Sequence, residues 1–272
     1  MAKIDETRWK FAQKNEQEFW GGEWNEGLSE NEKRCENYWK FHVDILKKHI
    51  DISDNLRILE IGGGVTLMIN YIDGGEKYSL DPLMDYFQKK FKLKKGIKYI
   101  TAKGEKMPFD KDFFDIIIIT NVIDHVNNYD EVLSEIRRVL KKSGVVYLSV
   151  DCHNYLLKKY RDFREKRGIG DPAHPHTFTL KSIKMVLKNL GFDCIYFRKG
   201  LGNQGIYVCN SKSKKSFLEK LKTSLKNGGI SRLLNSLIYR TLNKIGKFTS
   251  PEKEGSDFIF VLKKKNIFPR DE

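Results

Sequence analysis

The feature that most constrains this chain is an apolar strand that runs directly into three glycines, LRILEIGGG at residues 56–64. The apolar side chains between Leu56 and Ile61 predict a buried strand. The strand ends at Gly62, Gly63 and Gly64. Because glycine has no Cβ, the backbone of such a turn can approach a ligand closely. The stretch therefore predicts a ligand site at the carboxyl end of a buried strand.

The residues that follow alternate between strand and helix patterns at the spacing of β–α–β units. A helical pattern comes directly after the glycines, at 65–72. Further strands are predicted over 77–81, 97–101, 114–120, 144–150, 192–200 and 256–265. Further helices are predicted over 129–144, with Gly144 as the expected stop, and over 180–190, whereas 151–178 is expected to be irregular. This order predicts an α/β fold with a doubly wound parallel sheet, whose ligands bind at the carboxyl ends of the strands.

The composition is that of a globular protein and argues against several other classes. Hydrophobic residues make up 40% of the 272 residues, and the longest apolar run, near Ile116, is too short to span a bilayer. The charged N-terminal stretch does not have the pattern of a secretory signal. The four cysteines include no Cys-x-x-Cys pair, which argues against structural zinc, iron–sulfur ligation and a disulfide framework. We therefore expect a cytoplasmic protein.

The net charge of +14 is concentrated in one segment. Residues 211–250 carry ten basic residues and one acidic residue, with apolar residues at helical spacing on both sides of Gly228 and Gly229. Three interpretations stay open: a helical hairpin with a solvated basic face, contact with an anionic membrane surface, and RNA binding. RNA ranks last because arginine and aromatic side chains are scarce in the segment. Membrane contact would place the protein at the inner face of the membrane and would suit a lipid-linked acceptor.

The N-terminal segment contains all four tryptophans, Trp9, Trp20, Trp24 and Trp39. Apolar positions between Cys35 and Ile50 predict a helix at its end. The rings either anchor this arm to the main domain or form a lid that stacks on a sugar or another flat acceptor. The expected organisation is an aromatic arm at 1–54, a ligand-binding domain at 55–210, the basic insertion at 211–250, and a last strand with a tail at 251–272.

Two classes of cofactor bind at a strand followed by a glycine loop and a helix, and the details of this loop separate them. The nicotinamide fingerprint needs a glycine at the sixth position of the loop, where this chain has Leu67. Instead, Glu60 precedes the first glycine by two residues, where its carboxylate can face the ammonium group of an amino acid. Asp81 ends the next strand, 21 residues beyond Glu60. The LEIGGG stretch with these acids resembles motif I of the class I S-adenosylmethionine-dependent methyltransferases.

The resemblance extends in order over residues 56–192 and the closing strand near Phe258. It implies a Rossmann-like sheet of seven strands, with S-adenosylmethionine as cofactor and Asp81 on its ribose hydroxyls. Many members have an acid where this chain has Lys103. Adenine recognition would therefore rest on the backbone of Gly104 and Glu105, with Met107 as an apolar wall. The expected cofactor-binding residues are Glu60, Gly62, Gly63, Gly64, Asp81, Gly104, Glu105, Met107 and Asn121.

The reaction that the resemblance implies is an in-line methyl transfer, which needs alignment and, for a hydroxyl acceptor, a base. Histidine suits this role because its pKa lies near neutrality. The expected catalytic residues are Asp124, His125 and His176, with His153 and His174 as further candidates. Structural roles compete with catalysis, because these histidines also suit loop fixing and helix capping. Their spacing matches no recognised ligand set, so we predict no metal.

The expected function is methylation of an oxygen on a sugar, a glycan or another small molecule. The stretches NEQEFW at 15–20 and HPHTFT at 174–179 resemble methyltransferases of surface-polysaccharide pathways. The alternatives are an RNA methyltransferase, a nicotinamide-dependent oxidoreductase and a cofactor-binding scaffold without catalysis. A nucleic-acid partner is not expected, and the sequence leaves the oligomeric state open.

Overall fold

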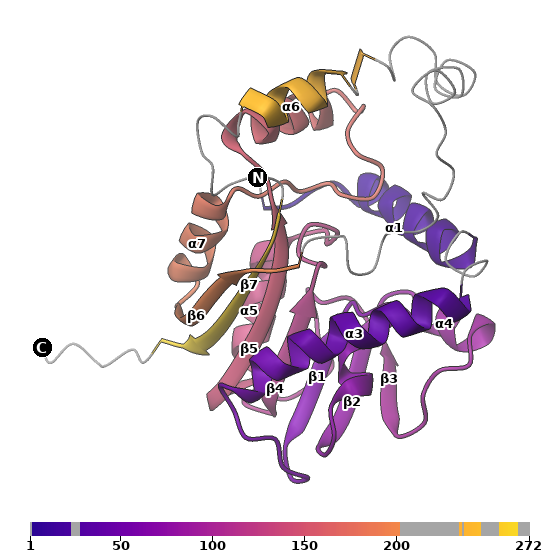
Figure 1. The fold of residues 1–272 in the computed structure, drawn as a ribbon, viewed down its shortest axis with the longest axis vertical. Helices are drawn as coiled ribbons and strands as arrows, with labels where there is room; N and C mark the ends of the chain where they lie inside the picture. Colours follow the sequence, from indigo (N-terminus) through magenta and orange to yellow (C-terminus); the bar gives the residue numbers. More distant parts are fainter. Residues whose placement is uncertain (1, 23–27, 202–233, 236, 246–255, 266–272) are drawn as a thin grey trace, which may run out of the picture.

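The computed structural model describes residues 2–22, 28–201, 234–235, 237–245 and 256–265, and its centre is one sheet of seven strands (Figure 1). The strands are β1 (Arg57–Ile61), β2 (Glu76–Asp81), β3 (Ile97–Thr101), β4 (Phe114–Thr120), β5 (Leu140–Cys152), β6 (Phe192–Lys199) and β7 (Ser256–Lys264). Their order in the sheet is β3-β2-β1-β4-β5-β7-β6. Strand β7 runs antiparallel between β5 and β6, and the other pairings are parallel. The predicted Rossmann-like methyltransferase fold is confirmed.

Helices cover both faces of the sheet (Figure 1). They are α1 (Glu6–Gly21), α3 (Leu28–Lys47), α4 (Met84–Lys90), α5 (Tyr129–Val139), α6 (Tyr155–Glu165) and α7 (Leu180–Asn189), with a short 3₁₀ helix η1 (Met68–Tyr71). Helices α3 and α4 contribute to the core on one face, and α5 and α7 to the core on the other.

Strand β4 shows why a central strand of this sheet is a continuous apolar run in the sequence. Its four consecutive isoleucines are fully buried. Ile116 and Ile118 belong to the core under α3 and α4, whereas Ile117 and Ile119 belong to the core under α5 and α7. A strand that is buried on both faces is apolar at every position, because successive side chains point to opposite sides of the sheet.

Three predicted elements differ from the structure. Helix α5 ends at Val139, not at Gly144, because β5 already begins at Leu140, which is fully buried and pairs with Phe114. The stretch expected to be irregular contains α6, whose N-cap Asn154 accepts a hydrogen bond from the backbone N–H of Leu157. The pattern after the glycines forms only the four-residue η1.

Helix α1 lies across the carboxyl ends of the strands and is tied down at its N-terminal end (Figure 1). The side chain of Asp5 caps it by accepting from the backbone N–H of Arg8. The backbone N–H of Ile4 donates to Asn127 O at 3.0 Å. The Arg8 guanidinium pairs with Glu165 of α6 at 2.6 Å. The N-terminal end of the arm is therefore attached both to the loop before α5 and to α6.

Most of the predicted basic insertion lies outside the described residues, as do Trp24 and Cys209. The part that is described, 234–235 and 237–245, contacts α6: Tyr160 Oη donates to Asn235 Oδ1 at 2.5 Å, and Asn154 Nδ2 donates to Leu242 O at 3.4 Å. The predicted domain boundaries stay predictions. None of the helices in the described part of the chain combines the length and apolar character needed to cross a bilayer.

Candidate functional site

A cavity of about 480 Å³ opens at the carboxyl ends of β1, β2 and β4, under α1. The loops of the sheet contribute Gly62, Gly63, Gly64, Asp81, Gly104, Glu105, Asn121, Val122, His125 and Asp151, among others. The N-terminal helices contribute Trp9, Glu16, Phe19, Trp20, Tyr38 and Trp39, among others, and the loop before α7 contributes His174. The cavity thus brings together residues that lie far apart in the sequence, at the edge where this class of sheet binds its ligands.

Each of the three glycines is required by its surroundings. Gly62 and Gly64 adopt φ values of +67° and +60°, which side-chain-bearing residues rarely adopt. A Cβ on Gly62 would lie 2.5 Å from Val122, and one on Gly63 would lie 2.1 Å from Leu67. A Cβ on Gly64 would lie 2.7 Å from the ring of Trp20. The loop therefore presents bare backbone to the cavity.

Glu60 lies beneath the glycine loop and is fully buried. Its two carboxylate oxygens accept hydrogen bonds from the backbone N–H groups of Met68 at 3.0 Å and Ile69 at 2.8 Å. Burial raises the pKa of Glu60 to about 7, against the effect of these two donors. The carboxylate holds the start of η1 and is not part of the cavity wall. Its contact with the ammonium group of a cofactor stays a prediction.

Asp81, at the end of β2, forms part of the cavity wall. Its Oδ2 accepts from the backbone N–H of Gly64 at 3.3 Å, and its Oδ1 accepts from that of Leu83 at 2.8 Å. Burial raises the pKa of Asp81 to about 6. Because a carboxylate has about four acceptor positions, two of them are left for the hydroxyls of a ribose.

The predicted adenine side is divided between the cavity and the core. Gly104 and Glu105 line the cavity, and Glu105 Oε1 accepts from the backbone N–H groups of Asn127 at 2.7 Å and Asn128 at 3.0 Å. Met107 is buried in the core under α5 and does not line the cavity. The apolar wall that the sequence predicts at this residue is therefore not in place.

Asn121 lines the cavity with φ +58°. Its buried Oδ1 has no hydrogen-bond partner among the residues that the structure describes. The bare glycine loop, the spare acceptor positions of Asp81 and this free amide oxygen fit a nucleoside linked to an amino acid. When bound, S-adenosylmethionine supplies a methyl group that its sulfonium centre has already activated.

The tryptophans of the N-terminal arm both anchor the arm and line the cavity. Lys103 Nζ lies 3.8 Å from the ring centroid of Trp9 and 2.9 Å from Glu6 Oε1. Trp20 packs edge-on against Phe87, with 6.2 Å between ring centroids. The two sequence-based interpretations of these rings, anchors and lid, are therefore compatible for Trp9 and Trp20.

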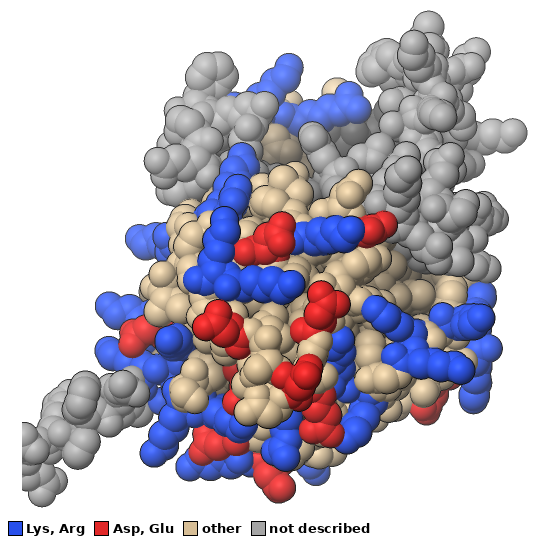
Figure 2. Space-filling view, turned by 60° about the horizontal axis from the view of Figure 1, so that its bottom comes forward, with Lys and Arg blue, Asp and Glu red and all other residues tan. Residues whose placement is uncertain are grey.

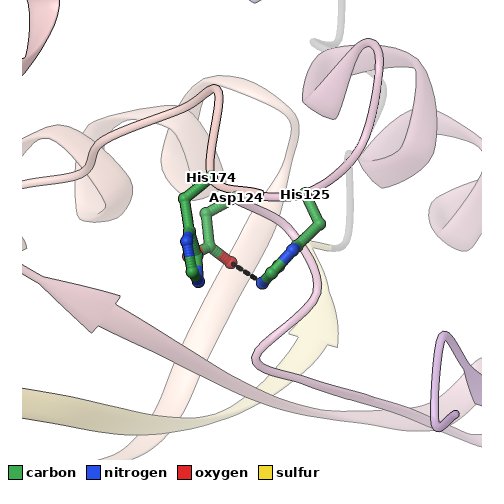
Figure 3. A group of neighbouring side chains, drawn as sticks. All are labelled: Asp124, His125 and His174. Atoms are coloured by element: carbon green, nitrogen blue, oxygen red, sulfur yellow. Dashed lines mark ion pairs between the residues drawn. The ribbon is translucent and has the colours of Figure 1, made fainter. Parts of the chain in front are cut away.

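His125 lies at the cavity, between the carboxylate of Asp124, which Figure 3 shows beside it, and that of Glu16. Its Nδ1 forms an ion pair with Glu16 Oε1 at 3.1 Å, outside hydrogen-bond geometry, and its Nε2 lies 3.8 Å from Asp124 Oδ1. Burial opposes the charge of the imidazole, but Asp124 and Glu16 outweigh burial and raise the pKa of His125 to about 9. This histidine is charged at neutral pH and must lose its proton before it can accept another.

The loop before α7 places His174, not His176, at the cavity. His174 Nδ1 lies 2.9 Å from Asp171 Oδ1, and its ring centroid is 4.3 Å from that of His125. His176 is buried, with Nε2 bonded to Val126 O at 2.9 Å, and is not part of the cavity wall. In a regular strand these two histidines, two residues apart, would point to the same side, so the irregular backbone of residues 174–177 is what separates them. The structure gives His176 a loop-fixing role, which was one of its two predicted roles.

His153 also lies outside the cavity wall. Its Nε2 is 3.0 Å from the Arg161 guanidinium. Burial, and next the charge of Arg161, lower the pKa of His153 to about 4.

Asp124, His125 and His174 form a group whose ligand atoms all lie within 4.8 Å of one another. The prediction of no metal rested on spacing along the chain. That spacing gives no signal for such a group, because His174 follows His125 only after about 50 residues.

Comparison with known proteins agrees with this geometry. The family described as Methyltransferase domain (Methyltransf_11) matches residues 59–148, which run from β1 to β5 and include the glycine loop. An uncharacterized protein of Methanocaldococcus jannaschii is 30% identical over 157 residues, which is 57% of this chain and 71% of that protein. The chain belongs to the class I S-adenosylmethionine-dependent methyltransferases.

Relatives of this methyltransferase differ in the acceptors that their names give. The sterol 24-C-methyltransferase of Clavispora lusitaniae is 25% identical over 169 residues, 57% of this chain, and the match spans 44% of that enzyme. The fold is similar to that of Haemonchus contortus phosphoethanolamine N-methyltransferase 2, solved with S-adenosylhomocysteine. That match has a TM-score of 0.52 at 16% identity and covers 84% of this chain and 53% of the other.

Proposed function

We propose that this methyltransferase transfers the methyl group to a hydroxyl oxygen of a sugar, a glycan or another small molecule. The observation that carries the proposal is the cluster of Asp124, His125 and His174, whose imidazoles line the same cavity as the glycine loop. A hydroxyl oxygen has to lose its proton as it takes up a methyl group. Carboxylate and imidazole groups within reach of the acceptor supply that function.

In the proposed reaction the acceptor oxygen attacks the methyl carbon in line with the breaking carbon–sulfur bond. The products are a methyl ether and S-adenosylhomocysteine, and the hydroxyl proton leaves through the cluster. Helix α1 holds the acceptor in place and excludes water, which is the alignment that methyl transfer mainly requires.

The size and lining of the cavity support a small, flat acceptor. A volume of about 480 Å³ lies in the lower half of the range of roughly 300–1,000 Å³ for sites of drug-sized ligands. The cofactor would occupy part of this cavity, and the acceptor would bind in the remainder. Trp9, Trp20 and Trp39 line it, and indole rings stack well on the apolar face of a sugar.

A second candidate is methylation of a carbon atom in a lipid. The names of two relatives support it: the sterol enzyme above, and the ubiquinone/menaquinone biosynthesis C-methyltransferase of Vibrio campbellii, which is 27% identical over 166 residues. The ubiquinone biosynthesis O-methyltransferase of Pelagibacter ubique, 31% identical over 116 residues, supports transfer to oxygen. The histidine cluster favours oxygen, because a carbon nucleophile activated by a double bond does not need the same base.

An acceptor screen with deuterium-labelled methyl donor tests the proposal. Sugar nucleotides, lipid-linked glycans, catechols and sterols are incubated with the full chain, and S-adenosylhomocysteine and labelled products are measured by mass spectrometry. We expect a methyl ether, identified by NMR, and a loss of about a hundredfold in turnover with His174→Ala. The matched control is His49→Ala, because His49 packs against Tyr196 outside the cavity. Labelled methyl on carbon would contradict the proposal.

We further propose that the enzyme docks on an anionic membrane surface through α6 and residues 237–245. This face exposes Tyr155, Phe163, Leu237 and Ile238, with Lys159 and Arg240 also exposed nearby. Exposed apolar side chains combined with basic ones favour the surface of an anionic bilayer. On the face shown in Figure 2, basic and acidic side chains are interspersed, which does not favour a nucleic-acid backbone as partner.

A further inference from the structure

We propose that Asp124, His125 and His174 bind a divalent first-row transition-metal ion at the wall of the cavity. Asp124 and His125 come from the loop after β4, and His174 comes from the loop between α6 and α7 (Figure 3). Two imidazoles and one carboxylate are a ligand set found in catalytic zinc and non-haem iron sites.

The carboxylate of the cluster is buried and has a free oxygen. Asp124 is 5% exposed, and its Oδ1 has no hydrogen-bond partner among the described residues. This is the oxygen that lies 3.8 Å from His125 Nε2. When His125 is neutral, as a metal ligand must be, this buried carboxylate oxygen has neither a donor nor a countercharge, and a cation at this position would compensate for it.

Both imidazoles are held so that Nε2 is available. His174 Nδ1 is hydrogen-bonded to Asp171 Oδ1 at 2.9 Å, whereas His125 Nδ1 forms an ion pair with Glu16 Oε1 at 3.1 Å that lies outside hydrogen-bond geometry. Asp171 is fixed in turn by Arg161 at 3.2 Å and by the backbone N–H of Ala173 at 3.1 Å. Histidine ligands in metal sites commonly donate their other ring N–H to a carboxylate, which fixes the ring and leaves a lone pair for the metal.

The charge and the size of the cluster suit a divalent ion. The charged groups around the imidazoles are Glu16, Asp124, Asp171 and Arg161. Three carboxylates and one guanidinium leave an excess of two negative charges when the imidazoles are neutral. Ligand bonds of about 2.0–2.2 Å in a tetrahedral site place the ligand atoms roughly 3.4 Å apart. The ligand atoms now lie within 4.8 Å of one another. Side-chain rotations that bring them closer together would therefore form the site.

The fourth position of such a site would face the cavity, because both imidazoles line it. The role of the ion rests on the proposed function, methyl transfer to a hydroxyl oxygen. Side chains that bind the ion no longer act as bases, so the ion would replace the cluster in that role: it would lower the pKa of the acceptor hydroxyl, whose proton leaves to solvent. The binding itself does not depend on that reaction, so the two claims can be tested apart.

The experiment is a calorimetric titration of the chelator-treated full chain with Zn²⁺, together with absorption spectra of the Co²⁺ form, both without cofactor or acceptor. We expect one ion per chain at this site, a Co²⁺ spectrum with nitrogen and oxygen ligands, and at least tenfold weaker binding with His174→Ala and with the isosteric Asp124→Asn. His49→Ala is the matched control and should bind as the parent does. Calorimetric titration of each variant with S-adenosylmethionine reports that the fold is intact.

Two results would overturn the inference: no Zn²⁺ or Co²⁺ binding by the parent, or binding that His174→Ala and Asp124→Asn both leave unchanged. Methyl transfer that continues undiminished in the presence of chelator would remove the role of the ion while leaving the proposed function in place. Metal binding by a chain that methylates no hydroxyl would remove the proposed function while leaving the metal site in place.

Discussion

Replacing Gly64 by alanine tests whether the glycine loop and the aromatic arm form one cofactor site. Gly64 adopts φ +60°, and the left-handed region costs a residue with a Cβ roughly 1–2 kcal/mol. The new Cβ would lie 2.7 Å from Trp20 Cζ2, and overpacking of a well-packed site costs typically about 1–3 kcal/mol more. We therefore expect Gly64→Ala to lower the free energy of unfolding by roughly 2–5 kcal/mol.

Gly96→Ala is the matched control. Gly96 has φ +83°, and a Cβ there would meet nothing within 4 Å, so only the backbone cost of roughly 1–2 kcal/mol applies. Urea unfolding of both variants isolates the contact with Trp20. Calorimetry should show at least tenfold weaker binding of S-adenosylmethionine for Gly64→Ala, because the displaced ring and loop enter the cavity. Adding Trp20→Phe should restore part of the stability. Equal unfolding free energies for the two glycine variants, with the parental affinity for S-adenosylmethionine, would show that the glycine loop and Trp20 do not form one cofactor site.

Three further predictions concern the cofactor, the core and the surface. Asp81→Asn should weaken binding of S-adenosylmethionine by about 10- to 100-fold, since hydrogen bonds to a charged group contribute roughly 1.5–3 kcal/mol. The control is Asp110→Asn, because Asp110 is exposed. Equal calorimetric affinities of the parent and Asp81→Asn would count against a role of Asp81 in binding. His42 is buried against Tyr147 at 2.7 Å, and burial lowers its pKa to about 3. The unfolded chain takes up this proton near pH 6.5 and the folded chain does not, so His42 by itself should lower stability by roughly 2 kcal/mol between neutral pH and pH 5. Glu60 and Asp81, whose pKa values burial raises, act in the opposite direction, so the test is the difference between two proteins. Urea unfolding at both pH values should show that acidification changes the stability of His42→Phe more favourably than that of the parent, and the same change in both proteins would contradict the assignment. The protein should sediment with anionic but not neutral vesicles, and less so with Leu237→Ser and Ile238→Ser combined; no sedimentation at low salt would exclude the membrane proposal.

The sheet could be predicted from the sequence because burial on both faces makes its strands continuous apolar runs. The four isoleucines of β4 and the step from Ile61 to the glycines identify strands without any knowledge of their neighbours. Helix α6 could not be predicted in the same way. Leu156, Tyr160 and Phe163 do stand at helical spacing, but Leu156 and Phe163 are exposed and Leu157 is the one fully buried side chain of α6, so the pattern does not correspond to a face packed on the sheet.

The sequence places Asp81 and the three glycines at the ends of strands, and the structure puts them in the cavity wall. Their contacts with a cofactor stay predictions, and Glu60 lies outside that wall. That Glu60 binds the backbone of η1 depends on how the loop folds after the glycines. The choice between His174 and His176 depends on the irregular backbone of the loop that carries both. The approach of His174 to Asp124 is a tertiary contact, which spacing along the chain does not reveal.

The most direct test of the account is a calorimetric titration of the full chain with S-adenosylmethionine and, separately, with NAD. We expect one S-adenosylmethionine per chain and no NAD binding. Leu67 stands where a nicotinamide dinucleotide requires a glycine, and its side chain is buried against the glycine loop. Binding of NAD, or of neither compound, would contradict the assignment of the cavity and the proposals that rest on it.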